Sequence, residues 1–248
     1  MEGVAYLIRL HPLATKLSNL GRARVTLMKK RNKAIVRELW GYAKALVLAL
    51  FITTFLFTTV GVAGSSMEPT LNGGVSSVSS LRDMARAFAF GDRLFVPKYE
   101  TWLRRANVLG DYQRGDVIVF RENPDSPCRT TKIPALLIKR LIGLPGDSVT
   151  IENGRVYING AALDQSFITG AGGMLGSSSL PAYRLQTDEY FVLGDNRNHS
   201  CDSRTYGPIH FGQIVGRPNS VIFPSRRENE TNWRALRRPE SFDIIPEP

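Results

Sequence analysis

Residues 147–160 read DSVTIENGRVYING, and this stretch decides the fold class. Two short runs of alternating apolar residues flank Asn153-Gly154, and an Asn-Gly pair between such runs is the strongest short-range signal for a β-hairpin. Asn159-Gly160 ends the second run with the same turn-forming residues. The stretch therefore predicts two antiparallel strands joined by a tight turn.

Similar short runs lie on both sides of this hairpin, apolar or β-branched and bounded by Gly, Asp, Pro or Asn. They are GDRLFVPK (91–98), GDVIVF (115–120), ALLIKRLIG (135–143) and DEYFVLGD (188–195). We expect an antiparallel, mostly β domain whose sheet folds on itself, rather than a βαβ repeat. A loop with a short helix around 81–88 and a Gly/Ser-rich surface loop at 169–180 interrupt the pattern.

The net charge of +10 is concentrated in an N-terminal arm. Residues 1–39 hold nine Lys or Arg against two Glu, a net +7, which leaves +3 for the remaining 209 residues. A nucleic-acid-binding domain would carry its basic residues on a folded surface. The charge distribution therefore predicts a basic arm and no nucleic-acid partner.

The arm leads into an apolar run, AKALVLALFITTFLFTTVGVAG (43–64). No charged residue occurs in the eighteen positions from Ala45 to Val62, about the minimum length that spans a bilayer. A cleaved signal peptide is the alternative, but its apolar core is usually roughly 7–15 residues long and its basic region short. The pattern favours an uncleaved membrane anchor.

Positive charge on one side of a span marks the cytoplasmic side. The sequence therefore predicts a single-pass protein of the cell membrane in four parts, with membrane lipid as one partner. These parts are a cytoplasmic arm (1–42), a transmembrane helix (43–63), an extracytoplasmic β domain (64–224) and a loosely held C-terminal tail (225–248).

Two cysteines, Cys128 and Cys201, lie in the outer part, where disulfides are permitted. One pair of cysteines in a sequence does not by itself establish a bond. No CxxC or Cys/His spacing typical of a metal site occurs, and the three histidines are widely separated. We predict neither a metal nor a cofactor.

The first candidate site is GSSMEPTL (64–71), where the chain leaves the predicted membrane helix. A serine attacks a carbonyl only when a base removes its proton and hydrogen-bond donors hold the oxyanion. Gly64 and Pro69 are turn formers on either side of Ser65-Ser66, and backbone N–H groups of a tight turn are such donors. Without a base, these serines would be ordinary solvated loop residues.

The second candidate is Lys139 within LLIKRLI (136–142). Alternate residues of a strand share a face, which groups Lys139 with Leu137 and Leu141. Lys139 and the adjacent cation Arg140 have apolar neighbours on both sides, which is costly unless the cations are paired or neutral. A buried lysine that has lost its proton is a general base. The alternative is an edge strand whose two cations reach into water.

The third candidate is GDNRNHSCDSR (194–204), which is polar at nearly every position directly after an apolar strand. Such density indicates an ordered, hydrogen-bonded loop, although an exposed polar turn has the same composition. An ion pair of Arg204 with Asp195 or Asp202 would compensate the charge of Arg140 nearby.

Together, these segments resemble the bacterial type I signal peptidases, which are Ser/Lys serine proteases. The resemblance covers about residues 43–223 and rests on SSMEPTL after a membrane span, followed in order by GDRLFV, IKRLIGLPGD and GDNRNHSCDSRTYG. It implies an all-β catalytic core with a smaller β insertion. It also implies roles for seven residues: Ser66 as nucleophile, Lys139 as general base, Ser200 as the residue that orients the lysine amine, and Asp195, Asp202, Arg204 and Arg140 as bracing ion pairs.

The chain departs from the family pattern at one position. Some members carry a hydroxyl residue two positions before the nucleophile as an oxyanion donor, and this chain has Gly64 there. Oxyanion binding is then expected to rest on backbone N–H groups, chiefly that of Ser66. Relatives in the endoplasmic reticulum use histidine in place of lysine, and the IKRLIGLPGD context argues against that branch.

The resemblance implies that the substrates are exported preproteins with small side chains one and three positions before the cut. Two alternatives remain: a specialised peptidase for one pilin or conjugation protein, and a catalytically silent, membrane-anchored binding domain. A silent domain would lack the serine or the lysine, and both are present. Self-cleaving repressors also use a Ser/Lys dyad, but they need a DNA-binding domain and no membrane anchor.

The motif assigns the nucleophile to Ser66 rather than Ser65, because Ser66 directly precedes Met67-Glu68-Pro69. Ser66→Ala should lower the rate of preprotein cleavage by about 10³-fold or more, whereas Ser65→Ala retains most of it. Cleavage rates of the two purified variants test the assignment. Activity lost in the Ser65 variant and retained in the Ser66 variant would reverse it.

Overall fold

The computed structural model describes residues 28, 31–75, 80–123, 125–129, 135–168, 179–223, 234–243 and 245. Most of the predicted arm, residues 169–178 of the predicted surface loop and residues 225–233 of the predicted tail lie outside this range. The chain divides into two units, Met1–Thr53 and Thr54–Pro248.

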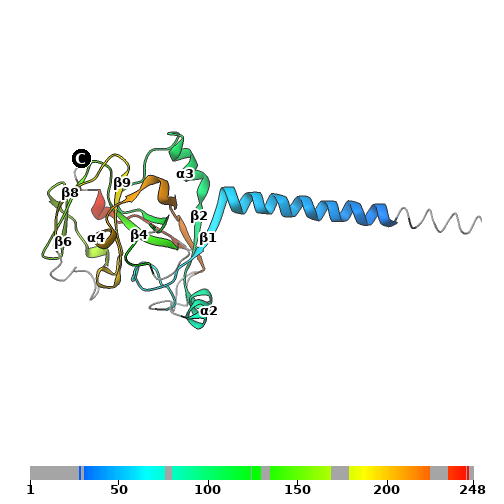
Figure 1. Ribbon diagram of the computed structural model, residues 1–248, viewed down its shortest axis with the longest axis horizontal. Helices are drawn as coiled ribbons and strands as arrows, with labels where there is room; N and C mark the ends of the chain where they lie inside the picture. The colour runs from blue at the N-terminus through cyan, green and yellow to red at the C-terminus, as the bar shows by residue number, and fades with distance from the viewer. Residues whose placement is uncertain are drawn as a thin grey trace, which may run out of the picture. The chain divides into compact units, whose positions relative to one another are not determined.

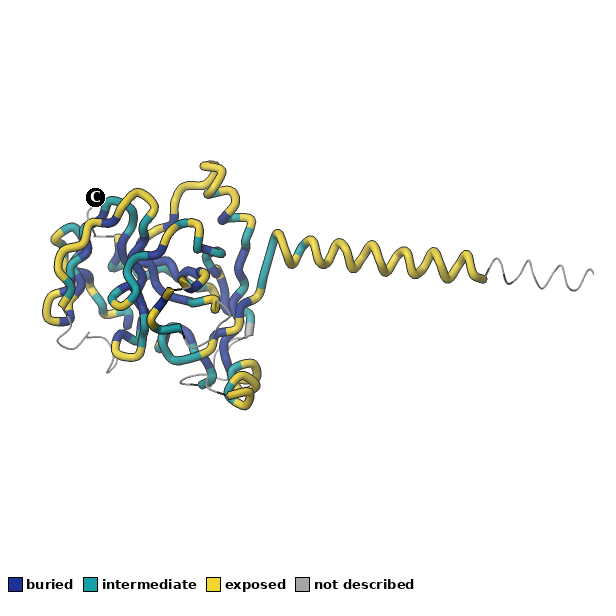
Figure 2. Tube along the Cα trace, viewed as in Figure 1, coloured by how far each residue is buried: buried dark blue, intermediate teal, exposed yellow. Residues whose placement is uncertain are grey.

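An N-terminal helix, Arg31–Leu56, has the length and composition to cross a membrane (Figure 1). The helix has 26 residues, an 18-residue stretch of it has a mean hydropathy of 1.7, and the apolar side chains along it are exposed (Figure 2). At 1.5 Å per residue its length is about 39 Å, enough for a bilayer core of roughly 30 Å. The last turn widens into a π-helix at Ile52–Leu56, where Thr53 Oγ1 donates to the carbonyl of Ala49 at 2.9 Å.

The helix ends at Leu56, although the sequence predicted a span that continues to residue 63. Residues Phe57–Gly61 form strand β1 instead, and all five pair with β2 (Arg93–Pro97). FTTVG is uncharged and β-branched, so its composition suits both a membrane helix and a strand. Pairing with β2, which lies more than thirty residues away in the sequence, decides between them.

The second unit is built from three antiparallel sheets, which confirms the predicted mostly β class (Figure 1). The first, in spatial order, is β1, β2, β12 (Ser220–Phe223) and β13 (Arg234–Ala235). The central sheet is β10 (Ile209–His210), β9 (Glu189–Leu193), β4 (Leu136–Gly143), β3 (Val117–Arg121) and β11 (Ile214–Gly216). The third is β7 (Ala161–Ala162), β6 (Arg155–Ile158), β5 (Ser148–Glu152) and β8 (Leu180–Arg184).

The predicted hairpin forms as β5 and β6, with Val149 opposite Ile158. Its turn residues Asn153 and Gly154 have φ angles of 46° and 78°. Positive φ at both central positions defines the turn type that Asn-Gly favours. The hairpin thus forms from local turn chemistry, as the sequence predicts.

Three α-helices lie within the described part of the second unit: α2 (Leu81–Phe90), α3 (Lys98–Arg105) and α4 (Ser203–Tyr206). α2 corresponds to the short helix predicted around 81–88, and Ser80 caps it by accepting a hydrogen bond from the N–H of Asp83. α3 was not predicted: only Lys98 lay within a predicted strand-like run, and residues 99–105 were assigned to no element.

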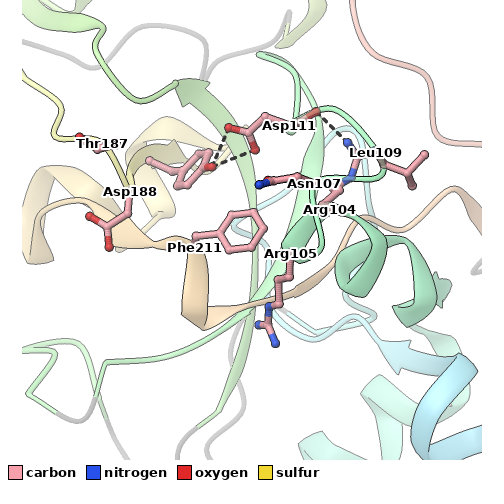
Figure 3. A pocket seen from close by; sticks show the side chains of 9 residues that line it. Arg104, Arg105, Asn107, Leu109, Asp111, Thr187, Asp188 and Phe211 are labelled. Atoms are coloured by element: carbon pink, nitrogen blue, oxygen red, sulfur yellow. Dashed lines mark hydrogen bonds between the residues drawn. The ribbon is translucent and has the colours of Figure 1, made fainter.

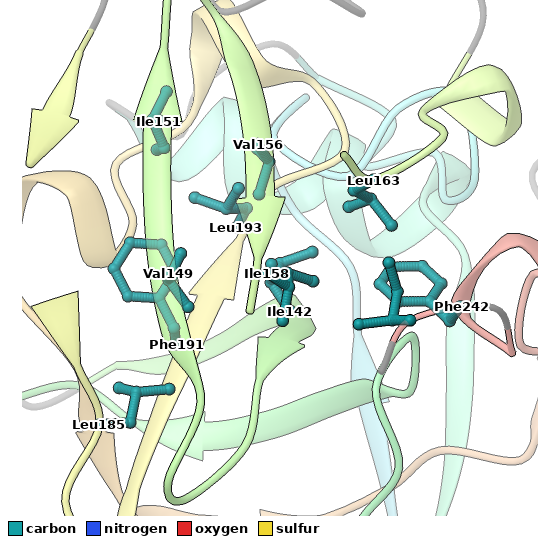
Figure 4. Packing of buried hydrophobic residues seen from close by; sticks show 11 residues of the cluster. Ile142, Val149, Ile151, Val156, Ile158, Leu163, Leu185, Phe191, Leu193 and Phe242 are labelled. Atoms are coloured by element: carbon teal, nitrogen blue, oxygen red, sulfur yellow. The ribbon is translucent and has the colours of Figure 1, made fainter. Parts of the chain in front are cut away.

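The described part of the C-terminal segment is packed onto the domain, in contrast to the predicted loose tail. Arg234–Ala235 pairs with β12, and Phe242 is only 2% exposed. Phe242 joins a core cluster between the third sheet and strands β4 and β9 (Figure 4). The segment looked loose in the sequence because a single buried aromatic creates no apolar period.

A buried ion pair joins the third sheet to the rest of the domain. Arg114 Nε and Nη2 donate to the two carboxylate oxygens of Asp147 at 2.8 and 2.6 Å. Asp147 also accepts from the Leu144 N–H at 2.7 Å and from Asn159 Nδ2 at 2.8 Å. The carboxylate therefore fixes both ends of the β5–β6 hairpin.

Replacing Asp147 with Ala should lower the free energy of unfolding by about 3–5 kcal/mol, because it leaves the guanidinium of Arg114 buried and uncompensated. Asp164→Ala is the matched control, since Asp164 is exposed and its hydrogen bonds within the described residues go to the nearby Ser166. Chemical denaturation of the two variants measures the difference. Equal stability of the two variants would show that the pair does not hold the sheet in place.

Candidate active site

Strand β4 carries Lys139 and Arg140 through the middle of the central sheet, between β3 and β9. Lys139 lies opposite Ile118, and Arg140 lies opposite Val117 on β3 and Leu193 on β9. Lys139 is 4% exposed and Arg140 2% exposed. The structure therefore excludes the alternative of an edge strand with two solvated cations.

The serine segment is held in a turn by backbone bonds and apolar anchors. The Glu68 N–H donates to the Ser65 carbonyl at 3.1 Å, and the Leu71 N–H donates to the Met67 carbonyl at 2.8 Å. Met67 and Leu71 are buried in the cluster that contains Ile138 of β4. The peptide bond between Glu68 and Pro69 is cis. These contacts place Ser66 against β4.

Ser66 and Lys139 meet, as the sequence predicts. Lys139 Nζ donates to Ser66 Oγ at 2.8 Å and to the carbonyl of Ile138 at 3.1 Å. Burial lowers the pKa of Lys139 from 10.5 to about 8. The carboxylates of Asp202 and Asp195 oppose this shift, whereas the charge of Arg204 adds to it.

Arg140, the cation next to Lys139 on the strand, pairs with Asp195. Arg140 Nε and Nη2 donate to the two oxygens of Asp195 at 2.8 and 2.6 Å, and Nη1 donates to the Gly115 carbonyl at 2.7 Å. Thr70 Oγ1 donates to the same carboxylate at 2.6 Å. A bidentate pair of this kind is among the stronger side-chain interactions in a protein.

A second pair orders the loop after β9. Arg204 Nε and Nη2 donate to the two oxygens of Asp202 at 2.7 and 2.8 Å. Asp202 also accepts from the Gly194 N–H at 3.0 Å and caps α4. Arg204 therefore pairs with Asp202, one of the two partners proposed for it. The other, Asp195, pairs with Arg140.

Ser200 lies at the site but does not make the predicted bond to the lysine amine. Its Oγ is buried and has no hydrogen-bond partner within the described residues. A Cβ added to Gly194 would overlap both Ser200 Oγ and the Ser66 carbonyl oxygen. The close packing on Gly194 thus brings Ser200 next to the backbone of Ser66. The Asn196 N–H donates to that carbonyl at 3.0 Å and ties the two segments together.

Sequence reasoning missed three residues that hold the serine turn: Thr70, Asp92 and Arg234. Arg234 Nη2 donates to the Thr70 carbonyl at 2.8 Å and contacts Asp92 at 3.3 Å. Asp92 also accepts from the Asn72 N–H at 2.9 Å. Thr70 lies inside a recognised motif, but nothing in the charged segment around Arg234 pointed to a backbone carbonyl more than 160 residues away.

A cavity of about 390 Å³ lies apart from the Ser66–Lys139 pair, between the end of α3 and the loop before β9 (Figure 3). Three of its polar residues bond to one another: Tyr190 donates to both oxygens of Asp111 at 2.9 and 2.8 Å, and Arg104 donates to the Asp111 carbonyl at 2.7 Å. We interpret this cavity as structural. Within the described residues, no three His, Cys, Asp or Glu side chains are grouped so as to hold a metal ion.

A family model described as signal peptidase, peptidase S26, matches residues 36–223. The chain belongs to the signal peptidase S26 family. Members of this family are serine endopeptidases that cleave signal peptides, and this chain has the same activity. Its N-terminal apolar helix suggests a membrane anchor.

Similar signal peptidases come from several bacteria. A probable signal peptidase I-2 of Synechocystis is 35% identical over 208 residues, covering 82% of this chain and 79% of its own. Signal peptidase I T of Bacillus subtilis is 33% identical over 215 residues, covering 83% and 94%. A crystal structure of a signal peptidase I from Enterococcus faecalis is 28% identical and covers 44% of this chain and 97% of its own, with a TM-score of 0.35.

In this signal peptidase, Cys128 and Cys201 form a disulfide that links the loop after β3 to the loop carrying Ser200 and Asp202. The two cysteines are 73 positions apart in the sequence. It is a structural link, because no step of serine-peptidase chemistry uses a thiol.

Replacing both cysteines with Ser should lower the free energy of unfolding by about 2–4 kcal/mol while leaving the cleavage rate of the folded enzyme largely unchanged. Thermal unfolding and preprotein cleavage, both followed well below the midpoint of unfolding, test the two parts. A double variant that folds normally but does not cleave would contradict this prediction.

Proposed function

We propose that Ser66 is the nucleophile of this signal peptidase and Lys139 its general base. The observation that carries the proposal is the 2.8 Å contact between Lys139 Nζ and Ser66 Oγ, made by a lysine whose pKa burial lowers to about 8. At pH 7 roughly one such amine in ten is neutral, compared with about one in 3,000 at the ordinary lysine pKa. The neutral amine then accepts the Ser66 proton across the same contact.

The reaction is acyl transfer in two steps. Ser66 Oγ attacks the carbonyl carbon of the scissile peptide while its proton moves to Lys139 Nζ. When the C–N bond breaks, the Lys139 ammonium returns the proton to the leaving amine, and an ester to Ser66 remains. Lys139 next takes a proton from water, whose oxygen attacks the ester and releases Ser66. Lys139 is again protonated and gives this proton back to Ser66 Oγ.

The tetrahedral intermediates carry an oxyanion that needs hydrogen-bond donors. Gly64 has no side-chain hydroxyl to offer, so the backbone N–H of Ser66 is the proposed donor. The Arg140–Asp195 and Arg204–Asp202 pairs act by position: the first holds Thr70 in the serine turn, and the second holds Gly194 and the Ser200 loop.

We propose exported preproteins as the substrates, bound as an extended strand against a sheet edge next to Ser66. An apolar groove of about 320 Å³ supports this, because residues 61–63, which lead into the Gly64-Ser65-Ser66 turn, line one side of it. Met84, Ala87 and Phe88 of α2 line the other side. A signal peptide has an apolar segment followed by small residues at its cleavage site, which matches an apolar groove beside the nucleophile.

The proposed topology places the basic arm in the cytoplasm and the β domain outside the cell membrane. The excess of Lys and Arg before residue 40 supports it. Preproteins emerging from the membrane would then meet Ser66 on the outer side, where the chain also keeps its disulfide.

The full-length protein in lipid vesicles should cleave several unrelated preproteins, each after a small residue. Changing the residue before the cut from Ala to Trp should abolish cleavage of that preprotein, since a shallow site cannot accept a large ring. Gel and mass-spectrometric analysis of the products provides the measurement, with Ser66→Ala as the blank. Cleavage of a single preprotein alone would favour a dedicated enzyme, and folded wild type that cuts none would favour a binding domain.

A further inference from the structure

The described C-terminal segment, residues 234–243, lies beyond the part of the chain that the family model matches, which ends at residue 223. It nevertheless reaches the catalytic site. Arg234–Ala235 forms β13, the edge strand next to β12, and Leu236 packs against the apolar cluster that anchors the serine turn. The segment therefore lies close to the part of the chain that carries Ser66.

Asp92 closes the base of the serine turn. The Asp92 N–H donates to the Asn72 carbonyl at 2.8 Å, and the Asp92 carboxylate accepts from the Asn72 N–H at 2.9 Å. The Asp92 carbonyl accepts from the Val62 N–H at 2.8 Å. Val62 and Asn72 lie just before and just after the turn that carries Ser66. Asp92 thus holds the two ends of the turn together, and it is only 2% exposed.

Arg234 connects this base to the turn itself. Its Nη2 donates to the Thr70 carbonyl at 2.8 Å and to the carboxylate of Asp92 at 3.3 Å. Within the described residues, no backbone N–H donates to the Thr70 carbonyl, so Arg234 supplies the hydrogen bond that this carbonyl needs. The guanidinium charge also compensates the buried carboxylate of Asp92, which would be costly to bury alone.

Thr70 is therefore held from two sides. Arg234 binds its carbonyl, and its hydroxyl donates to the carboxylate of Asp195 at 2.6 Å. Asp195 in turn receives two hydrogen bonds from Arg140, the residue next to Lys139 on β4. Through these bonds, Thr70 fixes the position of the serine turn relative to the strand that carries the lysine.

We propose that Arg234 is a positioning residue for catalysis. By holding the Thr70 carbonyl, it keeps the serine turn where Ser66 Oγ lies 2.8 Å from Lys139 Nζ. It acts through Thr70 and not on the reacting atoms. A shift of about 1 Å in a reacting group lowers a rate by roughly 100-fold, so a bond that prevents such a shift contributes directly to kcat. The inference rests on the proposed Ser66–Lys139 mechanism.

Arg237 supplies a matched control, because it is an exposed arginine of the same segment. Full-length wild type, Arg234→Gln, Arg234→Lys and Arg237→Gln are compared in preprotein cleavage, and kcat and KM are determined separately. Arg234→Gln removes the charge and shortens the side chain. Arg234→Lys keeps a charge for Asp92 and a donor for Thr70, but it lacks the planar fork of the guanidinium.

Arg234→Gln should lower kcat roughly 10- to 100-fold and leave KM within about twofold, because the lost bond orients the nucleophile and binds no substrate. Arg234→Lys should recover kcat in part, to a value several-fold below wild type. Arg237→Gln should equal wild type. Circular dichroism at the assay temperature gives the folded fraction of each variant, and kcat is expressed per folded enzyme. A loss of stability alone would lower the folded fraction and leave this kcat unchanged.

A wild-type kcat in folded Arg234→Gln would overturn the inference and leave the Ser66–Lys139 mechanism intact. If Arg234→Gln does not fold, a wild-type kcat in Arg234→Lys would overturn it instead. A raised KM with unchanged kcat would also overturn it, because Arg234 would then serve substrate binding. An equal fall of kcat in Arg237→Gln would show that the charge of the segment matters rather than the bond to Thr70. Activity that survives Ser66→Ala would reject the mechanism on which the inference rests.

Discussion

The carboxylate of Asp195 binds Arg140 and leaves Lys139, the next residue on the same strand, without a carboxylate in direct contact within the described residues. Lys139 and Arg140 are both buried in the middle of a sheet, but their surroundings differ. Arg140 is paired, with two of its nitrogens on the Asp195 carboxylate and the third on the Gly115 carbonyl. Lys139 is surrounded by apolar neighbours and by a serine hydroxyl, so burial favours its neutral form.

This division of charge accounts for much of the surrounding structure. Asp195 must face Arg140, and Thr70 of the serine turn bonds to the same carboxylate. Asp202 pairs with Arg204 in the loop beyond Gly194. If either carboxylate moved onto the lysine amine, it would stabilise the ammonium and raise the lysine pKa. By occupying the nearby acids, the two arginines therefore help to keep the pKa of Lys139 low and its amine available in the neutral form.

The sequence predicted features whose cause is local or carried by a motif. The β5–β6 hairpin follows from Asn153-Gly154, and the proximity of Ser66 to Lys139 follows from the family motifs. The predicted end of the apolar helix was wrong. The composition of FTTVG suits both a membrane helix and a strand, and its pairing with β2 makes it a strand. Arg234 was missed because it binds a backbone carbonyl, which leaves no signature in side-chain composition. The predicted hydrogen bond between Ser200 and the amine of Lys139 was wrong, because the packing of Ser200 on Gly194 determines where its hydroxyl lies.

The most direct test of a neutral lysine base is the pH dependence of kcat/KM for preprotein cleavage, measured for wild type, Lys139→Arg and Lys139→Ala. The folded pKa of Lys139 is lowered to about 8, so the wild-type rate should rise about tenfold between roughly pH 6 and pH 7 and level off above about pH 8. Lys139→Arg keeps a positive charge that is not lost in this range, so it should be as inactive as Lys139→Ala. Appreciable cleavage by the folded Arg variant would show that position 139 supplies charge rather than a base, and would contradict the account.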